Sequence, residues 1–341
     1  MNNSTQRIEY IDLAKFIGIF LMVLCHAGMH NMATSVIYAF HMPLFFFLSG
    51  YLYNRNNEIK FLPYLRKKAF SILVPYVIFA LILCYGTRGI LDWGYLFYSS
   101  RDSIAEAKSF TPLWFLPCFF VSTMVFFIID KVTSKNQITF YFFIILIAAI
   151  GFFLGEHREM LVWGFPGNID VAFVCVLVMA VGSSCKFIKI CKLGHLFVLG
   201  GVLLVMGVVL SLYNLPLSLT EGNPHVELST STYGNVFLFL TNLSILCVAV
   251  VCLCRVIIEC KLLPKRVSNI LSFYGANTIS VLCFHGIFLI IIRSIVKILG
   301  YNMIGFISPL VITITIFLIL YPIILFVNVT LPNIVGKKYK K

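Results

Sequence analysis

Three ionisable residues share one stripe of the first long apolar stretch of the chain. The stripe advances in steps of three and four residues through Asp12, Lys15, Ile19, Met22 and His26. Residues at these steps face the same side of a helix, and the eleven positions from Lys15 to His26 cover roughly 16 Å. An ionisable group at the centre of a membrane helix costs about 2.5 to 3.5 kcal/mol. The stripe therefore indicates a polar interior that serves chemistry or transport.

Further polar groups fall at matching depths in other apolar stretches. His41 lies about seven residues into the second stretch, which a very short turn joins to the first. If the first stretch enters the membrane from the cytoplasm, His26 and His41 lie at comparable depth on adjacent antiparallel helices, in the outer half. Trp114 opens the fourth stretch, Asp170 ends Gly164-Phe-Pro-Gly-Asn-Ile-Asp170 inside the sixth, and His285 lies in the middle of the ninth. One shared polar cavity accounts for all five residues.

Each residue also has a structural interpretation. A lone histidine such as His285 can hydrogen-bond a neighbouring helix, and Asp12 and Lys15 can form an i,i+3 ion pair. Trp114 can be an aromatic residue of the membrane interface. Asp170 is harder to explain this way, because two glycines and a proline interrupt its helix and leave backbone groups that need partners.

The residue types favour acid–base chemistry. Histidine is the side chain best suited to general base catalysis near neutral pH, so His26 could deprotonate a sugar hydroxyl as that hydroxyl attacks a thioester. A second histidine, or Asp170, could orient the base or stabilise developing charge. The basic run Arg66, Lys67 and Lys68 could hold the phosphates of a nucleotide-bearing acyl donor, although such runs often bind anionic lipid or set topology.

Composition restricts the fold class. Of 341 residues, 60% are hydrophobic and 11% charged, against about 25% charged in a globular domain, so we expect an all-α polytopic membrane bundle. The net charge of +13 does not indicate nucleic-acid binding, because the basic residues lie in short clusters between apolar runs. The eleven cysteines lie mostly within the apolar stretches and show no metal-ligand spacing, so we expect neither a structural metal nor disulfides.

Ten apolar stretches are long enough to cross a bilayer. They are 11–30, 34–53, 69–87, 112–130, 137–154, 162–182, 193–213, 234–254, 274–295 and 304–329. No internal repeat or linker divides the chain, so we expect one integral-membrane domain over 1–341 that ends in a basic cytoplasmic tail at 330–341. The first stretch lacks a signal-peptide cleavage pattern and should remain as an anchor.

The distribution of basic residues predicts the orientation. With the N-terminus in the cytoplasm, 19 of the 26 Lys and Arg residues fall in cytoplasmic segments and five in outer ones, while Lys15 and Arg293 lie within spans. The positive-inside rule then places both termini in the cytoplasm. The loop 214–233, which has no Lys or Arg, should face outward.

Longer motifs extend these interpretations. The stretch Tyr10-Ile-Asp12-Leu-Ala-Lys15-Phe-Ile-Gly-Ile, ending Val23-Leu-Cys-His26, resembles the opening signature of the acyltransferase family 3 membrane proteins. Phe40-His41-Met-Pro43-Leu-Phe-Phe-Phe-Leu-Ser49-Gly50-Tyr-Leu resembles their second-helix signature. Lys15 stands where Arg is commoner in the family. That lysine, with Leu113-Trp114-Phe115-Leu116-Pro117, Asn168-Ile-Asp170 and Phe284-His285, is similar to the branch named for fucose 4-O-acetylase.

The resemblance implies ten helices and transfer of an acyl group, usually acetyl from acetyl-CoA, to a hydroxyl of a cell-envelope glycan. By position, His26 would be the catalytic histidine, Lys15 its basic partner, and His41 part of the second signature. Arg66, Lys67 and Lys68 correspond to the family's cytoplasmic basic region, which would serve the CoA side. We expect His41 and Asp170 to assist catalysis, and Trp114 and His285 to contact the acceptor.

The expected protein is therefore an O-acyltransferase of the cytoplasmic (inner) membrane, with acyl-CoA as co-substrate and no resident cofactor. Its acceptor would be a surface or lipid-linked glycan. Two alternatives use the same cavity without acyl transfer: an exporter of polysaccharide or lipid-linked glycan, and a proton-coupled small-molecule transporter. The sequence leaves open the acceptor sugar, the acyl group, and whether transfer is direct or passes through an acyl-histidine.

Overall fold

Helices form nearly all of the chain that the computed structural model describes. The described residues are 8–29, 32–55, 59–88, 93–107, 110–133, 136–215, 225–298 and 307–338. Within these ranges no strand forms, and the one isolated β-bridge joins Glu227 to Thr232. The all-α prediction is confirmed. The basic residues Arg7, Lys108, Lys135, Lys340 and Lys341, which contribute to the predicted orientation, lie outside the described residues.

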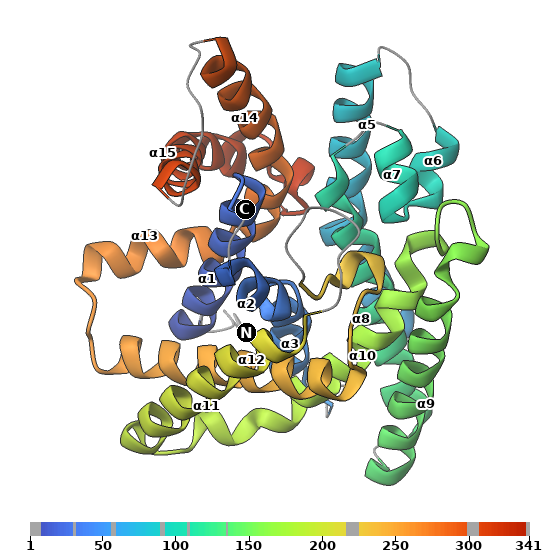
Figure 1. Ribbon diagram of the computed structural model, residues 1–341, viewed down its shortest axis with the longest axis vertical. Helices are drawn as coiled ribbons and strands as arrows, with labels where there is room; N and C mark the ends of the chain where they lie inside the picture. Colours follow the sequence, from blue (N-terminus) through green and yellow to red (C-terminus); the bar gives the residue numbers. More distant parts are fainter. Residues whose placement is uncertain are drawn as a thin grey trace.

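The described chain contains both long and short helices (Figure 1). The longer helices are α1 (Glu9–His26), α5 (Val74–Arg88), α8 (Phe115–Val132), α9 (Gln137–Glu156), α10 (Ile169–Ser184), α11 (Leu193–Tyr213), α12 (Val236–Glu259), α14 (Thr278–Ile298) and α15 (Ile307–Thr330). The shorter ones are α2 (Met32–Phe40), α3 (Pro43–Leu52), α4 (Phe61–Lys68), α6 (Trp93–Tyr98), α7 (Arg101–Glu106) and α13 (Lys265–Gly275).

Nine helical stretches of the described chain are long and apolar enough to cross a membrane. They correspond in order to nine of the ten predicted spans, from Met32–Leu52 to Ser308–Thr330. The remaining predicted span, the first in the chain at 11–30, corresponds to α1. The 18 residues of α1 include Glu9, Asp12 and Lys15. These charges exclude α1 from the nine, yet Asp12 is buried, so a charged long helix lies inside the bundle.

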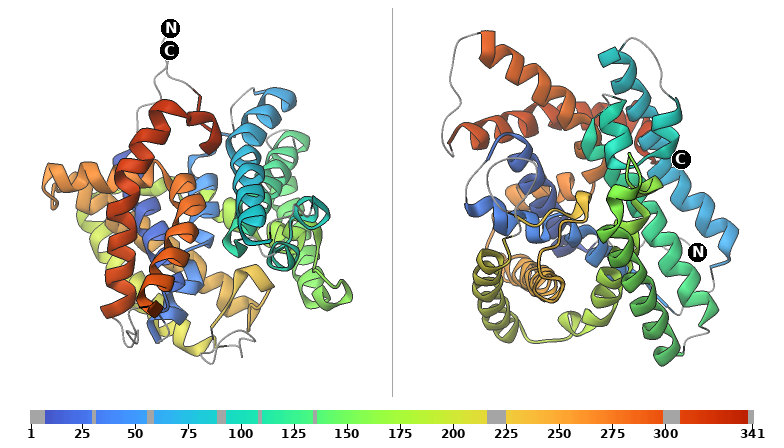
Figure 2. Two further views of the ribbon diagram at one scale, coloured as in Figure 1. Left: turned by 90° about the horizontal axis from the view of Figure 1, so that it is seen from above. Right: turned by 45° about the vertical axis from the view of Figure 1, so that its right-hand side comes forward.

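Helix α1 lies inside the bundle. It packs against α2, α3, α12, α13, α14 and α15, and Figure 1 shows it near the centre in blue. By contrast, α9 and α11 lie at the periphery, where large apolar side chains such as Phe142, Phe153 and Phe197 are about 60% exposed. Figure 2 shows both as outer helices in its second view. An apolar exterior around a more polar interior is the arrangement that a bilayer requires.

The second predicted span is not one continuous helix. Helix α2 ends at Phe40, His41 and Met42 form a turn, and α3 begins at Pro43. Proline has no N–H and is favoured in the first turn of a helix, so Pro43 marks the start of a new helix. Together α2 and α3 form one apolar stretch, Met32–Leu52, that is long enough to cross a membrane. His41 stands at the break between two helices.

Helices α3 and α10 approach unusually closely. A Cβ at Gly50 would overlap the carbonyl oxygen of Met179, and a Cβ at Gly182 would overlap that of Phe47. Small residues allow membrane helices to pack backbone against backbone. This contact holds α3, which follows His41, against α10, which carries Asp170.

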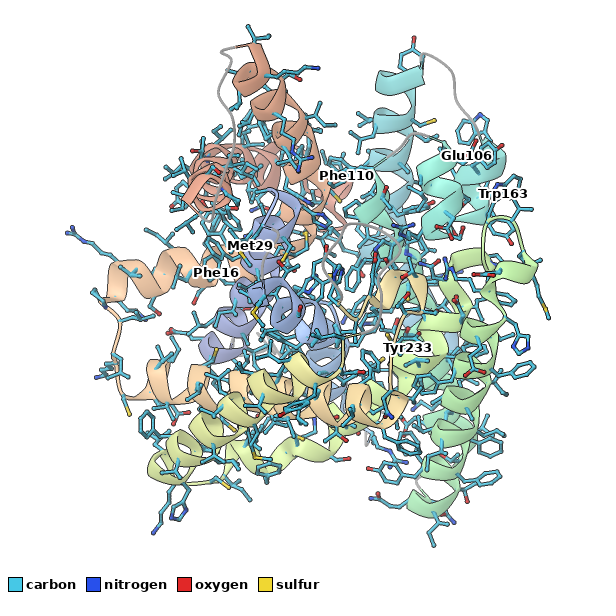
Figure 3. All side chains as sticks on the ribbon, viewed as in Figure 1. Phe16, Met29, Glu106, Phe110, Trp163 and Tyr233 are labelled. Atoms are coloured by element: carbon cyan, nitrogen blue, oxygen red, sulfur yellow. The ribbon has the colours of Figure 1, made fainter. Side chains whose placement is uncertain are left out.

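Short helices and irregular segments cover one end of the bundle. The rings of Tyr95 and Tyr98 contact Trp163 edge-on, and the Ser100 hydroxyl donates to the Trp163 carbonyl over 2.5 Å. Figure 3 labels Trp163 and Glu106 at this edge, where α6 and α7 meet the connection that precedes α10. These contacts fix α7 next to residues 157–168.

The C-terminal segment packs against the bundle as far as it is described. Residues Pro332–Val335 form a 3₁₀ turn that contacts α5. The ammonium group of Lys337 donates to the side-chain oxygen of Asn328 over 2.8 Å and also to that of Asn277. The described part of the segment predicted as a basic tail, up to residue 338, is therefore anchored through Lys337.

Candidate active site

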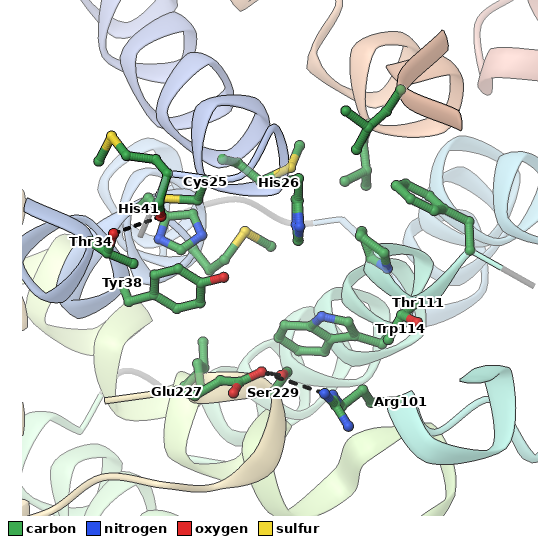
Figure 4. A pocket seen from close by; sticks show the side chains of 18 of the residues that line it. Cys25, His26, Thr34, Tyr38, His41, Arg101, Thr111, Trp114, Glu227 and Ser229 are labelled. Atoms are coloured by element: carbon green, nitrogen blue, oxygen red, sulfur yellow. Dashed lines mark hydrogen bonds and ion pairs between the residues drawn. The ribbon is translucent and has the colours of Figure 1, made fainter. Parts of the chain in front are cut away.

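A cavity of about 410 Å³ brings together residues from six segments of the chain. We name it the histidine cavity, and its polar lining consists of Cys25, His26, Thr34, Tyr38, His41, Arg101, Thr111, Trp114, His225, Glu227, Ser229 and Arg293. Figure 4 shows His26 and His41 along one wall, Glu227 and Ser229 along the opposite one, and Trp114 between them. The predicted association of His26, His41 and Trp114 in one cavity is confirmed.

His26 is positioned by the end of its helix. It is the last residue of α1, and its carbonyl oxygen accepts a hydrogen bond from Nη2 of Arg293 over 2.7 Å. A cation at a helix C-terminus is favourable because carbonyl groups there lack intrahelical partners. The half-buried His26 ring faces the cavity and lies 6.4 Å from the Phe110 ring, centroid to centroid. Arg293 therefore holds the backbone from which the His26 ring projects.

His41 has a defined tautomer. Its Nδ1 lies 2.8 Å from the carbonyl oxygen of Ile37. Because a carbonyl only accepts hydrogen bonds, Nδ1 of the neutral ring carries the hydrogen and Nε2 carries the lone pair. The His41 ring is 4% exposed and lies 5.1 Å from the ring of Tyr38. In a neutral His41, the basic nitrogen Nε2 is therefore not the one that bonds the helix carbonyl.

His285 lies behind the cavity wall and does not line the cavity. It is fully buried, and its Nδ1 lies 3.0 Å and 2.9 Å from the carbonyl oxygens of Val281 and Leu282. Its Nε2 has no hydrogen-bond partner. The His285 ring is 5.8 Å from that of His26. The expectation that His285 shares the cavity surface is wrong, but it is the immediate neighbour of a residue that does.

Asp170 does not line the cavity either. Gly164, Gly167 and Asn168 have positive φ values of 64°, 62° and 50°, so α10 begins only at Ile169 and Asp170 lies in its first turn. Its Oδ2 accepts hydrogen bonds from Nη1 of Arg158 over 2.6 Å and from the Ser231 hydroxyl over 2.7 Å. The predicted shared cavity is therefore wrong for Asp170, which has a buried ionic partner instead.

The Arg158 guanidinium is strongly held. Burial lowers the pKa of Arg158, but the neighbouring Asp170 and Asp102 carboxylates more than offset this and raise the pKa above its ordinary value. Nη2 of Arg158 donates to Oδ2 of Asp102 over 2.9 Å. This arginine therefore stays charged and ties two carboxylates from different segments together.

Several polar residues of the cavity were not predicted from the sequence, among them Arg101, His225, Glu227 and Ser229. The His225 ring packs 4.3 Å from that of Tyr38, so a third histidine lies beside His41. The loop 214–233 stood out only for its lack of Lys and Arg. The presence of both a histidine and a carboxylate in a loop predicted to face outward was the available signal.

A second cavity, of about 660 Å³, lies at the other end of α1. We name it the lysine cavity, because Lys15, Lys67 and Lys68 line it together with apolar and aromatic side chains such as Phe45, Phe115 and Phe119. Nζ of Lys15 lies 3.9 Å from Oδ1 of Asp12. This is the i,i+3 ion pair expected as the structural interpretation of the two residues. Lys15 and His26 share a helix face but line different cavities, so Lys15 does not reach the His26 ring.

Arg66 shares a cavity with Lys67 but not with Lys68. It lines a third cavity with Lys67, Ser71 and Lys338, whereas Lys68 lines only the lysine cavity. Lys67 borders both cavities, which makes them contiguous. The predicted basic cluster of Arg66, Lys67 and Lys68 is thus divided between the lysine cavity and the third cavity.

The histidine and lysine cavities have neighbouring linings, both along α1 and at the start of α8. Consecutive residues, Trp114 and Phe115, line the histidine and lysine cavities respectively. A Cβ at Gly18 of α1 would lie 3.1 Å from Cζ of Phe45, and the rings of Phe45 and Phe115 are 5.7 Å apart. We call Gly18, Phe45 and Phe115 the partition.

The comparison with protein families decides the affiliation. A family model described as an acyltransferase domain, Acyl_transf_3, matches residues 8–331. The chain belongs to acyltransferase family 3. The protein is a multi-pass membrane acyltransferase. A comparison with curated proteins finds no match. In this acyltransferase both cavities and the partition lie within the matched residues, whereas Lys338 lies beyond them.

Proposed function

We propose that this acyltransferase moves an acyl group, such as acetyl, from acyl-CoA to a hydroxyl of a surface or lipid-linked glycan. The supporting observation is the pairing of two cavities across the partition. One cavity is lined by His26 and His41, and the other by Lys15, Lys67 and Lys68. The first offers bases for a hydroxyl, and the second offers cations for the phosphates of CoA.

In this proposal the donor enters from the lysine cavity. The nucleotide phosphates contact Arg66, Lys67 and Lys68, and the thioester arm extends along the aromatic lining toward Phe45 and Phe115. The thioester carbonyl then reaches the histidine cavity past the partition. The basic-residue distribution supports the cytoplasm as the side of the lysine cavity, with both termini there.

His26 acts as the general base. The acceptor oxygen attacks the thioester carbonyl carbon as a nitrogen of His26 takes the hydroxyl proton. The tetrahedral oxyanion is stabilised by the Arg293 guanidinium, which lines the same cavity. The carbon–sulfur bond then breaks, and the CoA thiolate takes the proton from His26. The products are an O-acyl ester and free CoA.

His41 and His285 assist this chemistry. His41 can accept a hydrogen bond from an acceptor hydroxyl through Nε2, because its Nδ1 is bonded to Ile37. The unpartnered Nε2 of His285 can orient the neighbouring His26 ring. The resemblance to the fucose 4-O-acetylase branch supports a glycan as the acceptor class.

Replacing the base tests the proposal. His26→Ala should abolish acylation of the glycan and leave the unmodified polymer on the surface, which mass spectrometry of surface glycans would show as a missing acyl mass. His195→Ala is the matched control, since His195 is exposed and lies outside all three cavities. Loss of the surface polymer itself in His26→Ala would contradict acyl transfer and favour an exporter. Purified wild-type protein should also release CoA from acyl-CoA when acceptor is added, which a proton-coupled transporter would not do.

A further inference from the structure

The wall of the histidine cavity opposite His26 and His41 carries charged groups that the mechanism does not use. Glu227 and Ser229 come from the segment 225–233, and Arg101 comes from the start of α7 (Figure 4). The Ser229 hydroxyl donates to Oε1 of Glu227 over 2.6 Å, and Nη2 of Arg101 lies 3.8 Å from the same oxygen. These groups line the cavity beside the indole of Trp114.

The segment that presents Glu227 has a fixed backbone. The Glu227 N–H donates to the Thr232 carbonyl over 2.8 Å, and the Thr232 N–H donates to the Glu227 carbonyl over 3.0 Å. A 3₁₀ turn over Leu228–Thr230 fills the loop between them, and Ser231 closes it at φ 58°. Glu227 therefore points from a closed turn rather than from an open loop.

A ring of charges, with Asp170 and Arg158 buried and Arg101 and Asp102 partly buried, contacts this turn at Glu227 and Ser231. From Arg101, Nη1 donates to Asp102 over 2.9 Å, and Asp102 accepts from Arg158 over 2.9 Å. Arg158 donates to Asp170 over 2.6 Å, and Asp170 accepts from Ser231 over 2.7 Å. Ser231 and Glu227 belong to the same turn, so the chain of contacts returns to its starting segment.

Burying these charges does not by itself favour folding. A buried ion pair is weak support for stability, because apolar side chains of similar volume often stabilise a fold equally well. A closed ring of contacts instead fixes the positions of its side chains, because each carboxylate and guanidinium orients the next. Here it fixes Arg101 and Glu227 relative to Trp114.

We propose that Trp114, Glu227, Arg101 and Ser229 form the acceptor subsite, which recognises two neighbouring hydroxyls on a sugar ring. This inference rests on the proposed function. The apolar face of a pyranose packs on the indole, the Glu227 carboxylate accepts from the hydroxyls, and Arg101 and Ser229 donate to their oxygens. Asp170 and Arg158 are positioning residues, which act through Arg101 and the turn. The hydroxyl to be acylated then faces His26 and His41.

Steady-state kinetics of the purified full chain separate recognition from chemistry. With acetyl-CoA and a panel of methyl hexosides and N-acetylhexosaminides, Glu227→Gln and Arg158→Lys should raise the acceptor KM about tenfold or more. The donor KM should stay unchanged. A hydroxyl-binding site discriminates strongly against analogues that lack the hydroxyl, so Glu227→Gln should also lose the wild-type preference for hexosides over their deoxy analogues.

Asp130→Asn is the matched control. Asp130 is also buried and accepts hydrogen bonds from Arg55 and Tyr53, each over 2.8 Å, but it lies in α8 outside the charge ring. This variant should lower thermal stability and leave the acceptor KM unchanged. An equal rise of acceptor KM in Asp130→Asn, or none in Glu227→Gln, would overturn the subsite.

A binding measurement distinguishes failure of the subsite from failure of the proposed function. The chain has three tryptophans, so Trp93→Phe with Trp163→Phe leaves Trp114 as the fluorescent reporter. The same glycosides should quench it saturably, and Glu227→Gln should weaken that quenching. If wild type never releases CoA, the proposed function fails, and the quenching alone decides whether sugars bind. Absence of saturable quenching overturns the subsite even in an active enzyme.

Discussion

The His285 ring lies directly behind that of His26, with 5.8 Å between the centroids. Since Nδ1 of His285 is bonded to backbone carbonyls, its buried, unpartnered Nε2 is a hydrogen-bond acceptor next to the proposed base. A buried acceptor without a partner costs about 1 to 3 kcal/mol. In the proposed mechanism His26 gains a proton. A hydrogen-bond acceptor beside its ring could position that ring, so His285 is a candidate positioning residue.

Removing this acceptor should slow chemistry without affecting binding. We expect His285→Phe to lower kcat about 10- to 100-fold while the KM values for donor and acceptor stay near wild type. His285→Gln, which keeps an acceptor, should restore part of the rate. Steady-state kinetics check both variants, and an unchanged kcat in His285→Phe would assign this histidine to packing alone.

The tautomer of His41 gives a second prediction. His41→Ala should lower kcat/KM about 10²- to 10³-fold, because it removes an Nε2 lone pair from the cavity wall. His157 provides a close control: its Nδ1 bonds the Phe153 carbonyl over 2.8 Å in the same i−4 pattern, yet it lies outside the cavity. His157→Ala should retain wild-type rates. Equal losses in both variants would show that the helix contact, rather than the cavity nitrogen, matters.

The partition predicts how the acyl group passes. A side chain at Gly18 would press on Phe45, since a Cβ there already lies 3.1 Å from its ring. Gly18→Leu should therefore stop transfer while CoA still binds, as measured by calorimetry. Phe45→Ala should instead admit longer acyl chains, measured as the ratio of kcat/KM for butyryl-CoA to that for acetyl-CoA. Full activity in Gly18→Leu would place the donor path elsewhere.

The lysines should act on the nucleotide end of the donor. Lys67→Ala should raise the KM for acyl-CoA about tenfold, because a charged hydrogen bond contributes about 1.5 kcal/mol and 1.4 kcal/mol is tenfold. It should leave the KM for acyl-pantetheine, which lacks the nucleotide phosphates, unchanged. Lys265→Ala serves as control, since that lysine is exposed and pairs with Glu9. Equal effects on both donors would argue against phosphate binding at Lys67.

The close contact of α3 and α10 predicts a loss of stability. Gly50→Ala should destabilise the fold by about 1 to 3 kcal/mol, because the new methyl group overlaps the Met179 carbonyl. Gly201→Ala, on α11 with nothing within 4 Å of its Cβ, should be neutral or slightly stabilising. Thermal unfolding in detergent measures both, and a neutral Gly50→Ala would mean that α3 and α10 can separate.

Much of the architecture was predictable from the sequence, because long apolar runs have few alternatives in a membrane. The meeting of His26, His41 and Trp114 followed from estimated depths alone. The helical rise per residue also predicts that Lys15 and His26 lie far apart along the helix axis. A shared helix face over eleven residues still leaves roughly 16 Å between them, and they line different cavities.

The opposite wall was not predictable. Glu227 and His225 reach the cavity through a turn whose position depends on Asp170, Arg158 and Ser231, residues far apart in the sequence. Asp170 was singled out for the right local reason, the interrupted helix, but its partner Arg158 gave no pattern. The break at His41 was visible in Pro43, whose position predicts a helix start.

The partition consists of two aromatic rings and a glycine, and this composition has a consequence for the proposed transfer. If the thioester passes between the rings of Phe45 and Phe115, rotation of side chains is enough to open the way, and no rocking of helix bundles is required. Under the proposed function the coenzyme stays on the side of the lysine cavity, and only the acyl group crosses to the acceptor.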